Sequence, residues 1–92
     1  MKIQVGKFGT MLFARPAGKE AFLALQPLLR GMDDSEEVVV DFSDVAVMTP
    51  SWADEFVTPL RSQFQGRVRL LNTENPSVKA TLETLKKACR RP

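Results

Sequence analysis

Apolar and polar residues alternate along parts of the chain in ways that predict strands. Ile3 and Val5 alternate with polar neighbours, as in a short strand with one buried face. Residues 38–40 are consecutive valines, a run typical of a strand that is covered on both faces. Residues 67–71 predict a further strand. Residues 9–13 predict either a strand paired with the first one in a hairpin or an ordered loop, and we favour the strand.

Apolar residues at helical spacing predict a first helix over residues 16–30. Phe22, Leu25 and Leu29 share one face of this helix, and the glycine at position 31 is expected to end it. Pro27 lies inside the segment and removes a backbone hydrogen bond. We therefore expect a kink or an early end near Pro27.

The second predicted helix starts near Thr49 and carries the heaviest apolar stripe of the chain. The members of this stripe are spaced four residues apart and therefore face one way: Trp52, Phe56, Leu60 and Phe64. We expect the stripe to pack against the strand at residues 38–40. Pro59 is expected to interrupt the hydrogen-bond ladder of the helix.

The third predicted helix begins with Asn75 as its cap and Pro76 in its first turn. Four residues make up its predicted buried face: Val78, Leu82, Leu85 and Cys89. The helix completes a pattern in which strands and helices alternate along the whole chain.

This alternation predicts an α/β fold with a small sheet and about three helices. The sheet should be mostly parallel, with right-handed crossovers, and mixed if residues 11–13 pair in a hairpin. A chain of 92 residues that is 43% hydrophobic suffices for one core, so we expect residues 1–92 to form a single domain. Phe8 and Phe13 are expected in that core, because large apolar side chains are usually buried.

Composition excludes most enzyme chemistries. The chain has no histidine and one cysteine, Cys89, which argues against a zinc site, an intrachain disulfide and a histidine-dependent nucleophile. The amino terminus lacks the apolar core of a signal peptide, and no long apolar run follows. We therefore expect a cytoplasmic protein with no membrane span, no catalytic residue, no metal and no cofactor.

Two hydroxyl residues stand at the predicted start of the second helix. Ser51 can cap the helix together with Asp54, whereas Thr49 followed by Pro50 is an equally good cap. One cap is enough, so the other hydroxyl would lie at a helix amino terminus, a position that favours an added phosphate. Asp54 and Glu55 oppose such a phosphate by charge repulsion.

Charged residues suggest two alternative functions, a site for Mg²⁺ or a nucleotide and a contact with nucleic acid. Asp41 and Asp44 follow the central strand and, with Asp54 and Glu55, form a candidate acidic edge for Mg²⁺ or a nucleotide. Four basic residues near the carboxyl terminus are candidates for contacts with a nucleic-acid backbone: Lys86, Lys87, Arg90 and Arg91. We favour neither alternative, because strand ends and helix ends explain these charges and the net charge is only +2.

The segment that starts with Asp41-Phe42-Ser43 resembles the core of the STAS domain, the fold of bacterial anti-sigma-factor antagonists. A closer likeness is to a STAS-like family of bacterial domains of unassigned function with a recurrent Thr/Ser-x-Ser-Phe-Ala-Asp-Glu. The corresponding residues here are Thr49-Pro50-Ser51-Trp52-Ala53-Asp54-Glu55. The likeness extends over residues 37–88.

The resemblance implies a non-enzymatic regulatory module that binds a protein partner. By this resemblance the partner is a histidine-kinase-like ATPase that acts as an anti-sigma factor or a serine kinase, docked at the start of the second helix. Thr49, Ser51, Trp52, Asp54 and Glu55 are the candidate docking or phosphorylation residues. The antagonists read Asp-Ser-Ser-Gly-Leu at this point, so Pro50 stands where their phosphorylated serine lies. We therefore expect docking without phosphorylation.

Overall fold

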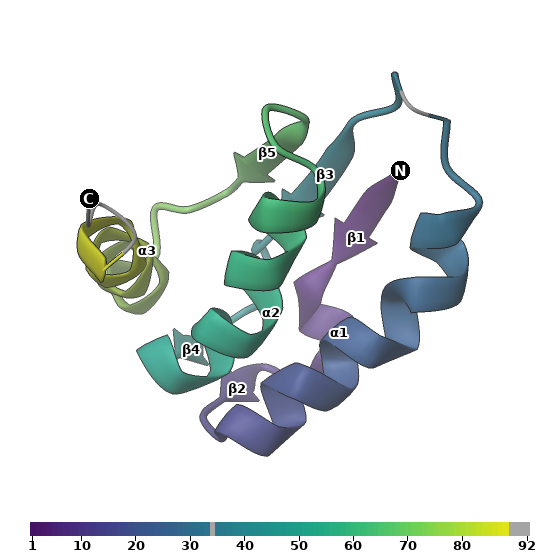
Figure 1. The fold of residues 1–92 in the computed structure, drawn as a ribbon. Coiled ribbons are helices and arrows are strands. Elements are labelled where there is room, and N and C mark those ends of the chain that lie inside the picture. Colours follow the sequence, from purple (N-terminus) through teal and green to yellow (C-terminus); the bar gives the residue numbers. More distant parts are fainter. Residues whose placement is uncertain (34, 89–92) are drawn as a thin grey trace.

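The structure, a computed structural model, describes residues 1–33 and 35–88 (Figure 1). In chain order its elements are strand β1 (Lys2–Gln4), the short 3-10 helix η1 (Val5–Phe8), strand β2 (Met11–Leu12), helix α1 (Arg15–Arg30), strand β3 (Val38–Asp41), strand β4 (Val47–Met48), helix α2 (Pro50–Gln63), strand β5 (Val68–Leu71) and helix α3 (Pro76–Ala88). The α/β class with three helices and a small, mostly parallel sheet is confirmed.

The strands pair in parallel in two separate groups. Three of them form a sheet in the order β1-β3-β5, and β2 pairs with β4. The prediction that residues 9–13 contain a strand is confirmed for Met11–Leu12, but the predicted hairpin with the first strand is wrong. The helical turn Val5–Phe8 replaces the tight turn that a hairpin requires, and β1 pairs with β3 instead.

The two faces of the three-stranded sheet have different chemistry. The register places Ile3, Val40 and Leu70 side by side, and α2 passes in front of β3 on this face, with α1 beside it (Figure 1). Side chains alternate along a strand, so Val39 points to the other face, between the residues paired with it, Lys2 and Arg69. Val39 is only half-buried, so the expectation that this strand is covered on both faces is wrong.

Helix α2 lies at the centre of the core, as its apolar stripe predicts. Trp52, Phe56, Leu60 and Phe64 are all buried, and they belong to one apolar cluster with Val38 and Val40. The rings of Trp52 and Phe56 stack with their centroids 4.9 Å apart. Each large side chain of this kind stabilises the fold by about 1.5–3 kcal/mol when it leaves water.

Both interior prolines are accommodated without ending their helices, so an early end of the first helix near Pro27 is wrong. Helix α1 continues past Pro27 to Arg30, and α2 continues past Pro59 to Gln63. An interior proline costs about 3 kcal/mol in an ordinary helix. The turn that follows each proline contains a buried leucine, Leu29 at 3% and Leu60 at 0% exposed, and this burial offsets the lost hydrogen bond.

Phe8 and Phe13 lie at the surface, which corrects the expectation that both belong to the core. Phe8 is 36% exposed and touches Phe56 edge-on, with the ring centroids 5.6 Å apart. Phe13 is 49% exposed, because it follows the short strand β2 on the outside of the β2–β4 pair. Exposed aromatic residues of this size often mark a contact surface.

Helix α3 begins as predicted. The side-chain oxygen of Asn75 accepts hydrogen bonds from the backbone N–H groups of Ser77 and Val78, at 2.7 and 3.3 Å. Val78 and Leu85 are buried and Leu82 is half-buried, whereas Cys89 lies outside the described residues. In the described part of the chain, no helix combines the length and the apolarity that crossing a membrane requires.

Replacement of Phe56 by alanine should lower the free energy of unfolding by about 3–5 kcal/mol, because the side chain is fully buried. Phe13→Ala is the matched control: it removes the same group from an exposed position and should change stability by about 0.5 kcal/mol or less. Urea denaturation of both variants measures the difference. Equal losses for the two variants would contradict the position of α2 in the core.

Candidate functional site

Thr49, not Ser51, caps helix α2. The Thr49 hydroxyl oxygen accepts a hydrogen bond from the backbone N–H of Trp52 at 3.4 Å, and Pro50 occupies the first helical position. Ser51 lies in the first turn with its side chain exposed. The sequence left both caps open, and the structure assigns the role to Thr49.

The Thr49 hydroxyl also ties α2 to the chain that precedes α1. It donates a hydrogen bond to the backbone carbonyl of Phe13 at 2.7 Å. This contact follows from the parallel pairing of β2 with β4, which aligns Leu12 with Met48 directly before each helix. The exposed side chains of Met11 and Phe13 therefore lie beside the start of α2.

A cluster of three charged residues forms the neighbouring part of this surface. One guanidinium nitrogen of Arg15 lies 2.9 Å from a carboxylate oxygen of Asp54 and 2.7 Å from one of Glu55. The hydrogen bond from Arg15 lowers the pKa of Asp54, and a second one from the Thr58 hydroxyl adds to this effect. The same two carboxylates raise the pKa of Arg15. Arg15 therefore offsets part of the charge of the two carboxylates, and the cluster as a whole is less negative than Asp54 and Glu55 alone.

A close approach of the two helices places Arg15 within reach of this acidic pair. A Cβ atom at Gly18 would lie 2.3 Å from the backbone carbonyl oxygen of Trp52, so only glycine allows this packing of α1 on α2. Sequence reasoning missed both Arg15 and Gly18. A glycine inside a predicted helix is the one signal that pointed to a close contact there.

Trp52 is fully buried beneath this surface, at 1% exposed. It supports the first turn of α2 from inside. We use the name α2-start surface for the surrounding residues: Met11, Phe13, Arg15, Ser51, Asp54 and Glu55. A groove of about 210 Å³ adjoins it, between β2, the start of α1 and Trp52.

Asp41 occupies a separate polar cluster at the carboxyl ends of the strands. Its carboxylate accepts hydrogen bonds from the Asn72 side-chain amide at 2.8 Å and from the Ser43 backbone N–H at 2.9 Å. Lys2 and Gln4 approach the other carboxylate oxygen, at 3.5 and 3.4 Å. The Asn72 hydrogen bond first, then the Ser43 hydrogen bond and the charge of Lys2, lower the pKa of Asp41 to about 2. Asp41 thus links the ends of β1, β3 and β5.

The structure does not assemble the acidic edge that the magnesium alternative requires. Asp41 is engaged by amide donors, Asp54 and Glu55 by Arg15, and Asp44 is exposed. Among residues 1–33 and 35–88, no three His, Cys, Asp or Glu side chains come together as a metal site would need. Of the basic residues near the carboxyl terminus, Lys86 and Lys87 are exposed on α3, whereas Arg90 and Arg91 lie outside the described residues.

A family of known domains matches the central part of this chain. Residues 25–78, more than half of the chain, match the family model of a STAS-like domain of unknown function (DUF4325). The chain belongs to this STAS-like family. Neither the search of curated proteins nor the search of solved structures gave a match. The STAS-like match contains β3, β4, α2 and β5 in full, and so the whole of the first turn of α2.

Thr49→Ala should lower the free energy of unfolding by about 0.5–2 kcal/mol, the usual cost of losing an N-cap. Ser51→Ala should change it by about 0.5 kcal/mol or less, since Ser51 is exposed and another residue caps the helix. Chemical denaturation of both variants checks this. A larger loss for Ser51→Ala than for Thr49→Ala would show that Ser51 is the cap.

The low pKa of Asp41 makes stability fall in acid. The ionised carboxylate is favoured in the folded state, so its contribution is complete above the unfolded pKa of about 3.9 and is lost as the pH falls to about 2. The carbon-detected NMR titration of Asp41 should therefore have its midpoint near 2. Asn72→Ala removes the main donor and should raise this midpoint, whereas a wild-type midpoint near 4 would contradict the cluster.

Proposed function

We propose that this STAS-like domain is a non-enzymatic regulatory module that binds a protein partner through the α2-start surface. The observation that carries the proposal is the exposure of two large apolar side chains, Met11 at 60% and Phe13 at 49%, beside the first turn of α2. Apolar side chains left in water add nothing to the stability of a folded domain. A partner that covers them removes apolar surface from water, and this stabilises the complex.

The composition of the α2-start surface supports a protein partner. Interfaces between proteins combine a small apolar centre with a polar rim. Met11 and Phe13 supply the apolar part, and the exposed Ser51 hydroxyl with the Arg15, Asp54 and Glu55 cluster supplies the polar part. The Thr49 hydrogen bond to the Phe13 carbonyl holds the two parts in a fixed relation, which lowers the entropy cost of binding.

The partner that we propose is a histidine-kinase-like ATPase acting as an anti-sigma factor or a serine kinase. Membership of the STAS-like family and the likeness of the Asp41 to Glu55 segment to anti-sigma-factor antagonists support this class. The absence of histidine from the sequence supports a binding role instead of an enzymatic one.

We propose further that docking proceeds without phosphorylation. Pro50 stands where the antagonists carry their acceptor serine, and Asp54 and Glu55 already place carboxylates next to Ser51. Phosphopeptide mass spectrometry of protein from its native cell tests this part separately. Stoichiometric phosphate on Ser51 or Thr49 would overturn it.

Binding of the full chain to a purified kinase-like ATPase from the same cell tests the docking proposal. Such an ATPase should first be retained from a lysate by the tagged wild-type chain. Met11→Glu and Phe13→Glu should then weaken its affinity by at least about tenfold, because each buries a charge in the apolar centre of the interface.

Leu28→Glu is the matched control, since Leu28 is as exposed as Met11, at 60%, but lies near the far end of α1. This variant should bind as the wild type does. Circular dichroism should show the same melting curve for all three variants. If no kinase-like ATPase binds, or if Leu28→Glu weakens binding as much as Met11→Glu, the α2-start surface is not the docking site.

A further inference from the structure

Strand β5 lies at an edge of the described sheet with backbone groups directed outward. The Val38 and Phe42 N–H groups donate to the carbonyls of Arg67 and Leu71, at 2.7 and 3.1 Å. In a parallel ladder, alternate residues bond to the same neighbour. The N–H and C=O groups of Val68 and Leu70 therefore point away from β3, toward the open side of the sheet.

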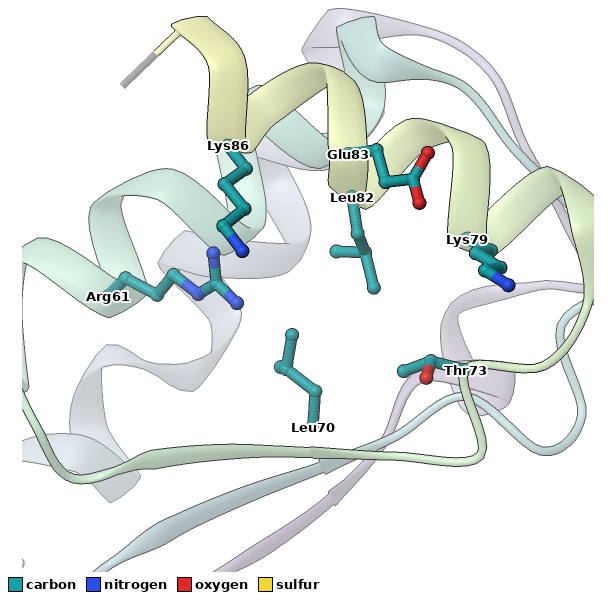
Figure 2. Close-up of a pocket in the computed structure, with 7 residues that line it drawn as sticks. All are labelled: Arg61, Leu70, Thr73, Lys79, Leu82, Glu83 and Lys86. Atoms are coloured by element: carbon teal, nitrogen blue, oxygen red, sulfur yellow. The ribbon is translucent and has the colours of Figure 1, made fainter. Parts of the chain in front are cut away.

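A cleft of about 210 Å³ lies along this edge, between β5 and α3 (Figure 2). Leu70 and Leu82 point toward one another across it and form its apolar middle (Figure 2). Both leucines are only half-buried. The other lining residues are Arg61, Thr73, Lys79, Glu83 and Lys86.

The charged residues of this β5–α3 cleft are mainly basic, three cations with a single carboxylate. The side chains of Arg61 and Lys86 point toward each other at one end, and Lys79 lies at the other (Figure 2). The ion pairs of the described residues involve other side chains. Converging cations repel one another, and a bound carboxylate relieves that repulsion.

We propose that the β5–α3 cleft binds an extended acidic segment of a partner protein, which adds to β5 as a further strand. Its backbone would pair with the outward N–H and C=O groups of Val68 and Leu70. One apolar side chain would fill the space between Leu70 and Leu82, and acidic side chains two residues away on either side would meet the cations.

The dimensions of the cleft agree with this arrangement. Lys79 and Lys86 are seven residues apart on α3, which corresponds to about 10 Å along the helix axis. Two side chains four residues apart on a strand, on the same face, are separated by about 13 Å. A pattern of acidic, any, apolar, any, acidic residues therefore places its carboxylates close to the two cationic ends.

Other ligands fit the cleft less well. A nucleic-acid strand binds through stacked aromatic side chains and phosphate contacts, but none of the lining residues is aromatic. A fully ionised phosphate group accepts hydrogen bonds and donates none, so it leaves the outward carbonyls of β5 unpaired, whereas a peptide backbone satisfies both kinds of group.

A peptide with glutamate, serine, leucine, serine and glutamate in this order, slightly longer than β5, tests the proposal on the full chain. Its addition should shift the amide NMR signals of Val68 and Leu70 and slow their hydrogen exchange, which reports new backbone hydrogen bonds. A peptide of the same sequence with N-methyl groups along its backbone keeps the charges but loses the backbone donors. It should bind at least roughly tenfold more weakly.

Charge-reversal variants show whether the peptide binds in the cleft or at another surface. The double variant Arg61→Glu with Lys86→Glu should lose at least roughly tenfold in affinity, whereas Lys19→Glu, at an exposed position on α1, should bind as the wild type does. Binding should weaken as salt is added. Phe13→Glu should leave it unchanged, so this result is independent of docking at the α2-start surface.

Several outcomes would overturn the proposal. These are equal binding of the N-methylated peptide or of a peptide with lysine in place of both glutamates, shifts at the β1 edge instead of β5, and tighter binding of a single-stranded oligonucleotide. Self-association of the chain that the double variant abolishes would assign the cleft to a second copy, whose acidic residues 33–37 would be the occupant.

Discussion

The burial of one face of α2 is the constraint on which the rest of this domain depends. Phe56 and Leu60 are fully buried, and α2 packs against α1 and α3 as well as the sheet. Because the stripe runs the length of the helix, it fixes the rotation of α2 about its axis. The two ends of the helix then present different groups to the outside, Ser51 at the start and Arg61 in the last turn.

The start of α2 shows how packing and surface chemistry are linked. Gly18 lets the backbone of α1 approach Trp52, and this approach brings Arg15 to Asp54 and Glu55. A side chain at position 18 would separate the helices and release the ion cluster. The exposed surface that we propose for docking is therefore set by a buried contact that no partner touches.

The two proposed surfaces use different physical forces. The α2-start surface offers apolar side chains, so binding there depends on the hydrophobic effect and responds little to salt. The β5–α3 cleft offers backbone groups and cations, so binding there depends on hydrogen-bond geometry and falls with salt. Because the two surfaces lie at opposite ends of α2, the domain has the means to hold two segments at once.

Local patterns in the sequence determined the helices and the central strand. The spacing of Trp52, Phe56, Leu60 and Phe64, the valine run at residues 38–40 and the Asn75 cap each depend on neighbours within a few residues. The buried helix face, the strand and the helix cap that they predict are all present. Such patterns also suffice for the α/β class and the STAS-like resemblance.

Only the tertiary structure decided which distant segments meet. The pairing of β2 with β4 and the contact of Arg15 with Asp54 join residues more than thirty positions apart, and no local pattern encodes such a partner. The exposure of Phe13 was likewise not predicted from the sequence. The same holds for the cap of α2. Thr49 and Ser51 are equivalent in local chemistry, and the carbonyl of Phe13, supplied by the segment after β2, is an additional partner that Thr49 has. Local periodicity reports which face of an element is apolar, whereas the site depends on which elements the fold sets side by side.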